Sequence, residues 1–391
     1  MTHESLRFGV FLAPFHALEE NPAALFDRDL DLISEVEALG FDEAWFGEHH
    51  SGGFETIAAP ELMIAAAAER TRHIRLWAGV KSLPYHNPFV VADTMVQLDH
   101  MTRGRALFGV GPGALPSDAH QFGIEPRDTR RMMDESLDVI MRLMDGERVT
   151  ARTDWFNLRE ARLQLGNYTK PHMEMAVTSI RSPAGAVAAG KYGIGMLSLG
   201  GVSDDALEAY ARNWGICEEA AAQHGKTVSR KNFRVAIFMH LSDSRENALA
   251  DISHGFDKWL GYSQDVLAFG PVPKGTENPV DFMIDTRRAV IGTPDDAIQA
   301  IEDALAGTGG FGVVLLMAHD WADGAAAAHS RELFARDVIP HFRDHSAGRR
   351  DSYNFASDHH EQFLDAAKKG VSDADDRYKA DKEAAKKGPD S

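Results

Sequence analysis

The sequence predicts an α/β protein built as a (β/α)8 barrel (TIM barrel) with insertions, followed by a charged C-terminal extension. Three observations lead to this prediction: eight strand-length apolar runs, a helical pattern after each run, and no break in the alternating order. Continuously apolar strands separated by amphipathic helices are typical of a parallel sheet that is covered on its outside. Eight such units close a barrel, whereas an open doubly wound sheet is the alternative. We expect the barrel at residues 1–343 and the extension at 344–391, partly disordered or helical.

Each element is expected where the local sequence favours it. Strands are expected at residues 7–15, 41–47, 74–80, 106–110, 173–178, 195–199, 233–241 and 312–317. Helices are expected at 25–39, 60–70, 88–100, 127–144, 182–191, 204–224, 294–306 and 325–342, with one more from about 245. Gly40 follows the first helix, where a left-handed backbone is favoured. Pro60 and Pro88 begin the next two helices. Residues 145–172 are less regular, and the glycines and prolines of 254–286 predict a long irregular excursion.

Composition restricts the function classes. The 391 residues carry a net charge of −18, which disfavours binding to nucleic acid and to anionic membranes. The single cysteine, Cys217, excludes an intramolecular disulfide and a cysteine-clustered metal site. No apolar run approaches the ~20 residues of a membrane span, and the N-terminus lacks a signal-peptide core, so we expect a cytoplasmic protein. Residues 365–391 are rich in Lys, Asp, Glu and Ala, which predicts a solvated helix or a disordered tail.

Three ionisable residues, Glu48, His49 and His50, follow the second expected strand. Barrel enzymes hold their catalytic groups at this end of the strands. Adjacent strand residues point to opposite faces, so the two histidines cannot easily share an ion, and no metal site is expected. One imidazole at the barrel mouth would serve as a base or a hydrogen-bond partner, and a histidine packed in a structural role is the alternative. A metal-dependent barrel hydrolase is the most distant alternative.

Two strand ends carry small residues that let a flat ligand approach the backbone. The first is Ala78-Gly79-Val80, and the second is the run GVGPGA from Gly109, which includes Gly111. The second run formally fits the dinucleotide-binding pattern G-x-G-x-x-G/A. Two prolines, at 112 and 116, lie where that motif requires a helix to start, so we interpret it as a loop that passes close to a planar ligand.

A phosphate site is expected after the fifth strand, in the run TSIRSPAG. Ser182 and Pro183 are a natural helix cap and first residue, and the free amides that follow face an incoming anion. The hydroxyl of Ser179 and the charge of Arg181 would complete the cradle, together with the backbone at Gly185. A capped helix without a ligand is the alternative interpretation.

Taken together, these residues resemble the bacterial-luciferase-like flavin-dependent monooxygenases, a family of (β/α)8 barrels. The resemblance covers residues 7–343 and rests on FGVFLAPF, FDEAWFGEHH, AGVKSLPYHNP, LDHMTRGRALFGVGPG, the SPAG helix start and TPDDAIQAIEDAL. Within the family it is greatest to the limonene 1,2-monooxygenase and alkanal monooxygenase subgroup, on GEHHSGG, SLPYHNPF and the ending AHDWAD…SRELFARDVIPHF.

The resemblance implies a two-component system. A separate NAD(P)H-dependent flavin reductase would supply reduced FMN or FAD, and O2 would add at flavin C4a to give a hydroperoxide that transfers one oxygen atom to an apolar substrate. His49 would assist the flavin–oxygen chemistry, and residues 78–80 would contain the family's non-proline cis peptide beneath the flavin ring. Residues 254–286 would form a mobile lid. A homodimer or a higher homo-oligomer is expected.

The resemblance also assigns Ser179, Arg181, Ser182 and Gly185 to the flavin phosphate. The chain departs from the luciferases at Pro112, where they carry an arginine, and at Gly185, where a hydroxyl residue contacts the phosphate. We expect Arg181 to compensate for the missing hydroxyl.

We therefore expect a flavin-dependent monooxygenase that acts on a small apolar molecule, with epoxidation of a terpene such as limonene as the leading expectation. An F420-dependent dehydrogenase on the same fold is one alternative, and it would transfer hydride without O2. A non-catalytic flavin-binding protein is another, and it would be indifferent to the loss of His49.

Overall fold

The computed structural model describes residues 6–13, 15–180, 182–344 and 346–386 of the chain. The chain divides into two compact units, the first ending at Arg343 and the second starting at Asp344. Within the described part, no helix is both long and apolar enough to cross a membrane.

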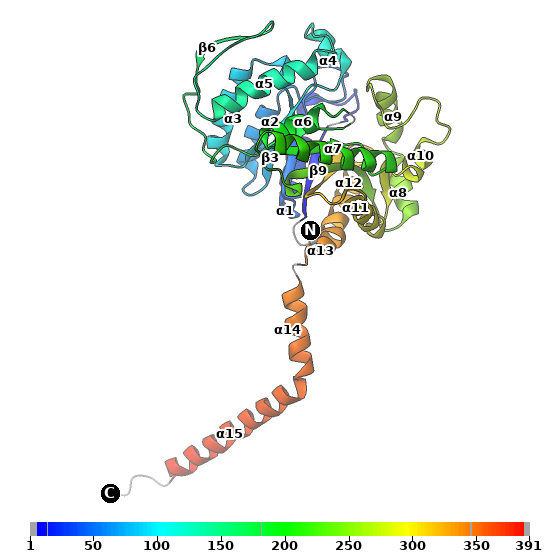
Figure 1. The fold of residues 1–391 in the computed structure, drawn as a ribbon. Coiled ribbons are helices and arrows are strands. Elements are labelled where there is room, and N and C mark those ends of the chain that lie inside the picture. The colour runs from blue at the N-terminus through cyan, green and yellow to red at the C-terminus, as the bar shows by residue number, and fades with distance from the viewer. Residues whose placement is uncertain (1–5, 14, 181, 345, 387–391) are drawn as a thin grey trace. The chain divides into compact units, whose positions relative to one another are not determined.

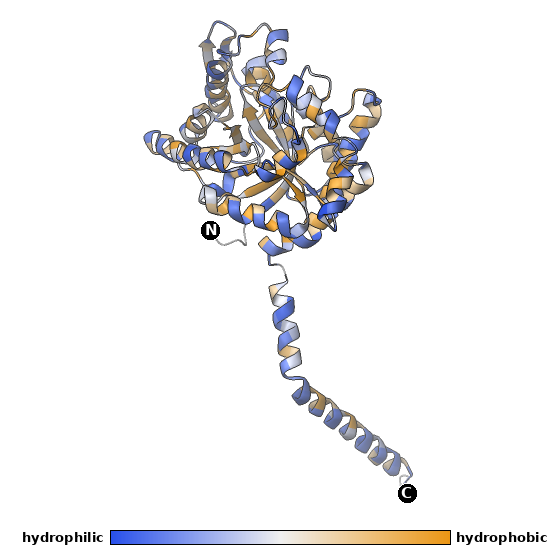
Figure 2. Cartoon of the chain, turned by 90° about the vertical axis from the view of Figure 1, so that its right-hand side faces the viewer, coloured by the Kyte–Doolittle hydropathy of each residue, from blue (hydrophilic) through white to orange (hydrophobic). Residues whose placement is uncertain are grey.

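The first unit is a closed barrel of eight parallel strands, so the predicted (β/α)8 fold is confirmed (Figure 1). In ring order the strands are β1 (Arg7–Leu12), β2 (Glu43–Phe46), β3 (Arg75–Ser82), β4 (Ala106–Gly111), β7 (Met175–Thr178), β8 (Gly195–Leu199), β9 (Phe233–Leu241) and β11 (Val313–Ala318). Each strand pairs with the next, and β11 pairs with β1 to close the ring. Figure 2 shows apolar residues concentrated on the strands at the centre of the barrel and polar residues on the surrounding helices.

Two short strand pairings were not predicted. The strand β10 (Ala289–Gly292) lies beside the C-terminal half of β9, with Ala289 opposite Phe238. A hairpin of β5 (Val149–Arg152) and β6 (Asn157–Ala161) lies in the stretch expected to be less regular. These strands have only four or five residues, too few for an apolar period to be recognised.

The helices of the first unit largely follow the expected pattern. They are α1 (Pro22–Ala38), α2 (Pro60–Arg70), α3 (Pro88–Thr102), α4 (Pro116–Gln121), α5 (Thr129–Met144), α6 (Ala184–Tyr192), α7 (Asp204–Gln223), α8 (Arg245–Ile252), α9 (Phe256–Asp265), α10 (Pro279–Asp285), α11 (Pro294–Thr308), α12 (Gly324–Leu333) and α13 (Ile339–Phe342).

The prediction of an irregular excursion at 254–286 is wrong in part, because two of these helices, α9 and α10, lie within it. Phe256, Trp259 and Tyr262 give α9 one buried aromatic face, whose helical spacing the surrounding glycines obscured. All three side chains belong to the apolar cluster that also contains residues of the barrel interior. The helix α9 is therefore packed on the barrel strands.

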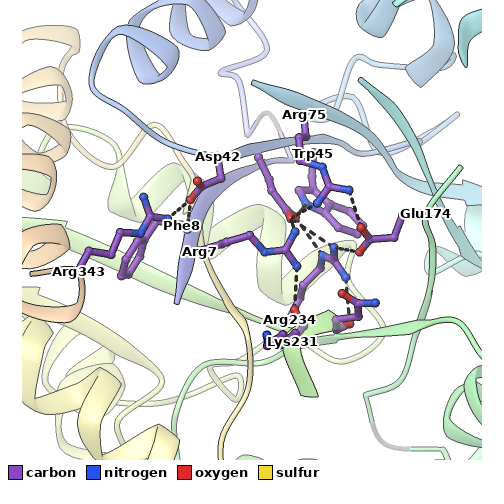
Figure 3. Close-up of polar contacts among 11 residues, drawn as sticks. Arg7, Phe8, Asp42, Trp45, Arg75, Glu174, Lys231, Arg234 and Arg343 are labelled. Atoms are coloured by element: carbon purple, nitrogen blue, oxygen red, sulfur yellow. Dashed lines mark hydrogen bonds and ion pairs between the residues drawn. The ribbon is translucent and has the colours of Figure 1, made fainter. Parts of the chain in front are cut away.

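The N-terminal ends of the strands form the barrel floor, which holds a buried ion network (Figure 3). The side chain of Glu43 on β2 is fully buried, and its carboxylate lies 2.7 Å from Arg7, 3.3 Å from Arg75 and 3.0 Å from Arg234. Glu174, directly before β7, pairs with Arg75 and Arg234 as well. The starts of these neighbouring strands are therefore tied together by charge at this end.

The network continues into a stacked pair of tryptophans. The rings of Trp45 and Trp77 stack with centroids 4.2 Å apart, and the guanidinium of Arg234 lies 4.2 Å from the Trp77 ring. The indole N–H of Trp45 donates to Glu43 at 3.2 Å. Burial alone would raise the pKa of Glu43, but the charges of Arg234 and the two other arginines outweigh it and lower the pKa. The carboxylate therefore stays ionised inside the barrel.

The second unit consists of two helices, α14 (Ala347–Asp358) and α15 (His360–Lys386). None of their described residues is buried, and Figure 2 shows them coloured mostly as hydrophilic. In the structure, the described part of this extension is therefore helical and exposed.

Candidate active site

His49 lies shortly after β2, which ends at Phe46, at the C-terminal end of the barrel, and both of its ring nitrogens face carboxylates. Its Nδ1 is 3.0 Å from Oδ2 of Asp118, and its Nε2 is 3.3 Å from Oε2 of Glu55. The side chain is 13% exposed. Burial alone would lower the pKa of His49, but the charge of Glu55 and the hydrogen bond with Asp118 outweigh it and raise the pKa. This arrangement favours the protonated imidazole, which acts as a proton or hydrogen-bond donor.

Asp118, which sequence reasoning missed, orients His49 from the loop after β4. The short helix α4 starts at Pro116 and places Asp118 at 1% exposure. Its carboxylate also accepts hydrogen bonds from the Ser51 hydroxyl and from the backbone N–H of His50 at 3.1 Å. Burial would raise the pKa of Asp118, but the hydrogen bonds from His49 and Ser51 outweigh it and lower the pKa. The signal in the sequence that could have indicated Asp118 was a carboxylate residue soon after the barrel strand β4.

Glu55 and Tyr262, also missed, continue the chain of contacts beyond His49. The hydroxyl of Tyr262 donates to Oε1 of Glu55 at 2.8 Å, and both side chains are buried. Burial raises the pKa of Tyr262, and the neighbouring charge of Glu55 raises it further, so the phenol stays protonated as a donor. Tyr262 belongs to α9, so the excursion contributes directly to the surroundings of His49.

Glu48 joins the ends of β2 and β3. Its carboxylate accepts the backbone N–H of Ser82 at 2.7 Å and the ring N–H of His50 at 3.0 Å, and it contacts His86. Lys81 lies 3.3 Å from the same oxygen that the histidines contact. Among the described residues, Glu48, His50 and His86 have the spacing of metal ligands, with the ligand atoms within 4.8 Å of one another. Because an ammonium group shares that carboxylate oxygen, we interpret the cluster as an ion-pair and hydrogen-bond network.

We expect the substitution Glu48→Gln to destabilise the protein by about 3 kcal/mol at pH 7. Burial would raise the pKa of Glu48, but the hydrogen bonds of His50 and His86 and the charge of Lys81 outweigh it and lower the pKa from 4.5 to about 2. A lowered folded-state pKa stabilises the fold above the unfolded-state value, and this stabilisation is lost as the pH falls towards about 2. Urea unfolding of the wild type and of Glu48→Gln is measured from pH 7 to 3. The difference between their free energies of unfolding should shrink below about pH 4.5. A pH-independent difference would contradict the prediction.

The small residues at the ends of β3 and β4 lie side by side around a cis peptide. The structure places the non-proline cis bond between Gly79 and Val80, within the segment 78–80 expected to contain it. A Cβ atom at Gly111 would lie 2.5 Å from Cγ2 of Val80 and 3.0 Å from Oγ1 of Thr178. Only glycine therefore fits at position 111, and three neighbouring strands meet there.

The barrel interior explains two further glycines. A Cβ at Gly79 would lie 2.8 Å from Cβ of Trp45, and a Cβ at Gly109 would lie 2.7 Å from the indole ring of Trp45.

The strand β4 continues through Gly111, and α4 starts only at Pro116. The run GVGPGA therefore does not form a strand-to-helix dinucleotide turn, as the prolines indicated.

The start of α6 lies directly against the end of β7. A Cβ at Gly185 would lie 1.9 Å from the carbonyl oxygen of Thr178, so glycine allows this close packing. The helix starts at Ala184, whose N–H donates to the Ser182 hydroxyl at 3.3 Å, and the next amides have no partner within the helix itself. Val80, Gly111, Thr178 and Gly185 thus follow one another around the mouth.

The structure does not place two of the four predicted phosphate-binding residues at the start of α6. Ser179 is 1% exposed, and its hydroxyl accepts a hydrogen bond from Asn213 at 3.1 Å, so this side chain packs against α7. Arg181 lies outside the described residues. The contacts of Ser182 and Gly185 fit a phosphate at the α6 N-terminus better than those of Ser179.

Aromatic rings gather on the opposite side of the mouth. Phe238 stacks on Trp321 with centroids 5.4 Å apart, and Trp259 of α9 meets Trp321 edge-on at 4.9 Å and Phe15 at 6.3 Å. His319 stacks on Trp321 at 4.0 Å, and burial lowers its pKa to about 3, which supports its structural role. The mouth therefore has a small-residue side and an apolar aromatic side.

A closed (β/α)8 barrel with a carboxylate-paired histidine at the C-terminal ends of its strands defines a barrel enzyme. The family model described as luciferase-like monooxygenase matches residues 6–312. The chain belongs to this family, and it is an oxidoreductase of the flavin-dependent monooxygenase class. The resemblance noted in the sequence is thereby confirmed.

Individual relatives give a finer comparison. Limonene 1,2-monooxygenase of Rhodococcus erythropolis is 42% identical over 375 residues, covering 96% of this chain and 96% of that protein. 4-Hydroxyprotoasukamycin monooxygenase of Streptomyces nodosus subsp. asukaensis is 46% identical over 363 residues, covering 91% and 97%. The oxygenating constituent of 3,6-diketocamphane monooxygenase from Pseudomonas putida, solved in complex with FMN, has a similar fold (TM-score 0.73, 24% identity, 86% and 98% covered).

Proposed function

We propose that this protein is the oxygenase component of a two-component system, in which a separate NAD(P)H-dependent reductase supplies reduced flavin. The observation that carries the proposal is the row of Val80, Gly111, Thr178 and Gly185 at the barrel mouth, beside the strand end that bears His49. Interior glycines and a helix N-terminus fit a flat ring with a phosphate. Reduced flavin, when bound, supplies the electrons that activate O2.

The chain's own residues have separate roles in this proposal. Val80, Gly111 and Thr178 would hold the flavin ring, and the Ser182 hydroxyl with the first amides of α6 would hold the phosphate. Arg181 is proposed to add positive charge there. His49, kept protonated by its two carboxylates, would hold a proton at Nε2 for the reacting oxygen.

We propose a small apolar substrate, with epoxidation of a terpene such as limonene as the leading reaction. The aromatic side of the mouth supports an apolar substrate, because the half-buried Phe238 ring lies there on the buried rings of Trp259 and Trp321. The limonene enzyme, 42% identical over almost the whole chain, supports the terpene. The asukamycin enzyme is as similar and is named for a different substrate, so the choice of substrate needs a direct test.

The test is a product assay under 18O2. Purified protein is mixed with limonene and with FMN kept reduced by a separate NADH-dependent flavin reductase, and the product is analysed by mass spectrometry. We expect limonene 1,2-epoxide that carries one 18O atom. A hydroxylated product would support the monooxygenase class but show that the reaction is not an epoxidation. If FMN gives no oxygenated product, the assay is repeated with FAD. With neither flavin giving an oxygenated product, the proposal fails.

The two alternatives predict other results. An F420-dependent dehydrogenase would bleach oxidised F420 in the presence of an alcohol, without O2. A non-catalytic flavin-binding protein would bind reduced flavin and give no product, with or without His49.

We expect Gly185→Ala to weaken the binding of reduced FMN about tenfold, which corresponds to about 1.4 kcal/mol. The new Cβ would lie 1.9 Å from the Thr178 carbonyl oxygen, so α6 must move away from β7. Anaerobic flavin fluorescence titration measures the affinity. The control is Gly215→Ala in α7, where a Cβ meets no atom within 4 Å, and it should leave the affinity unchanged. Equal affinities of Gly185→Ala and Gly215→Ala for reduced FMN would show that the start of α6 does not belong to the flavin site.

We also propose that the protein forms a homodimer or a higher homo-oligomer. The helices α2 and α3 expose large apolar side chains, with Leu62 at 72%, Val90 at 59% and Met101 at 56%. Sedimentation velocity of the full chain tests this proposal, and a single monomeric species at micromolar concentration would contradict it.

A further inference from the structure

The helix α9 is connected to the candidate catalytic histidine by a continuous chain of buried polar contacts. Tyr262 of α9 donates to Oε1 of Glu55 at 2.8 Å, and Oε2 of the same carboxylate lies 3.3 Å from Nε2 of His49. Tyr262 and Glu55 are separated by 207 positions in the sequence. The carboxylate therefore connects two segments that are far apart in the sequence.

The contacts around Tyr262 hold α9 to the loop after β2. The ring of Tyr262 lies 4.8 Å from that of Phe54 and 5.6 Å from that of Phe15. A Cβ at Gly52 would lie 3.3 Å from the Tyr262 ring and 3.0 Å from Val266 of the excursion. The hydroxyl of Tyr262 can reach Glu55 only while α9 is seated on this loop, because the ring is fixed by its neighbours.

The groups that face His49 come from three segments. Glu55 lies on the loop after β2, Asp118 on α4, and Glu48 precedes His49 in the chain. Tyr262 reaches the same cluster from α9. Asp118 already has donors in Ser51 and the backbone, whereas Glu55 depends on Tyr262 and His49. Glu55 is therefore the partner of His49 that a movement of α9 would release.

We propose that Glu55 and Tyr262 are positioning residues for His49, and that the seating of α9 on the barrel mouth fixes the orientation and the proton of this imidazole. The proposal rests on the proposed function, in which His49 acts on the flavin–oxygen chemistry. It gives the helical part of the 254–286 excursion a defined role, because the imidazole is held between two carboxylates only when α9 is in place.

The first test does not need catalysis, so it is independent of the proposed function. Flavin-free protein labelled with 13C at histidine Cε1 is titrated by NMR, and the His49 signal is assigned with the variant His49→Gln. We expect Glu55→Gln to lower the pKa of His49 by about 1, because a carboxylate beside the ring is lost. Tyr262→Phe should increase deuterium exchange at the amides of α9. An unchanged or raised His49 pKa in Glu55→Gln would overturn the proposal.

The second test uses a double-mutant cycle on product formation. We expect Tyr262→Phe to lower kcat about tenfold with KM nearly unchanged, and Glu55→Gln to lower it by at least as much. Because the two residues act through one chain of contacts, the double variant should be no slower than Glu55→Gln alone. Losses that multiply would contradict the proposal. If Glu55→Gln fails to fold, the effect of Tyr262→Phe on kcat can still be measured alone, because this substitution removes only one oxygen atom.

The matched control is Gln264→Ala in the same helix. The Gln264 side chain donates to the carbonyl of Pro273 at 3.0 Å, so it stabilises the excursion without contacting the His49 cluster. We expect this variant to keep kcat within about twofold of the wild type. A tenfold loss in Gln264→Ala as well would mean that any loosening of the excursion lowers the rate, and the specific role of Tyr262 and Glu55 would be rejected.

Discussion

Replacing His49 by glutamine is expected to lower the rate of oxygenation by about 10²–10⁴, the range that a positioned acid–base group contributes. Both ring nitrogens of His49 are paired with carboxylates, Asp118 at 3.0 Å and Glu55 at 3.3 Å. Glutamine keeps a hydrogen-bond donor but carries no titratable proton. The loss should therefore appear in kcat, and the affinity for reduced flavin should change little.

The measurement is the initial rate of product formation with reduced flavin and limonene, together with the flavin affinity of each variant. The control is His50→Gln, the same substitution at the adjacent residue. The ring of His50 bonds to Glu48 at 3.0 Å and packs edge-on against Phe122 at 4.9 Å, so we expect a smaller loss there, of about tenfold or less. Equal rates for wild type and His49→Gln would show that His49 has a structural role only.

The second large effect is expected in stability: Glu43→Gln should destabilise the barrel by about 3–5 kcal/mol. The side chains of Glu43 and Arg234 are both fully buried. Glutamine preserves the shape and can still accept from Trp45, but it leaves three arginines with the single carboxylate of Glu174. The buried guanidinium of Arg234 has no water to solvate it, so the cost is far larger than for a surface pair.

Urea unfolding at pH 7 measures this effect. The control is Asp154→Asn, which also removes a carboxylate paired with an arginine, Arg131 at 3.0 Å, but on an exposed surface. We expect no measurable change for the control, because solvent screens exposed ion pairs. If Glu43→Gln unfolds at the same urea concentration as the wild type, the buried network does not stabilise the fold.

The barrel could be predicted because each of its units is encoded locally. Eight apolar runs and the helical patterns between them are short-range signals, and the closed ring of eight strands follows their order. Gly111 and Gly185 could be singled out for the same reason: a glycine at a strand end or helix start indicates close packing. The helix α9 was missed because its glycine-rich neighbours concealed an aromatic face that is recognised only once it is buried.

The partners of His49, the proposed catalytic histidine, could not be predicted. His49 and Asp118 are separated by 69 positions, and Glu55 and Tyr262 by 207. Which strand ends and loops meet depends on the closure of the barrel and on the seating of the excursion. Likewise, the hydroxyl of Ser179 was expected at the phosphate, but it faces Asn213 on the neighbouring helix.

By itself, the sequence determined the class of fold, the histidine at the mouth and the glycines around the proposed flavin site, because periodicity and local backbone preference are properties of adjacent residues. Only the tertiary structure decided the protonation partners of His49, the buried charges of the floor and the contact from α9. These depend on long-range burial, since a carboxylate changes its pKa and its role only when folding removes water and brings a partner within hydrogen-bond distance.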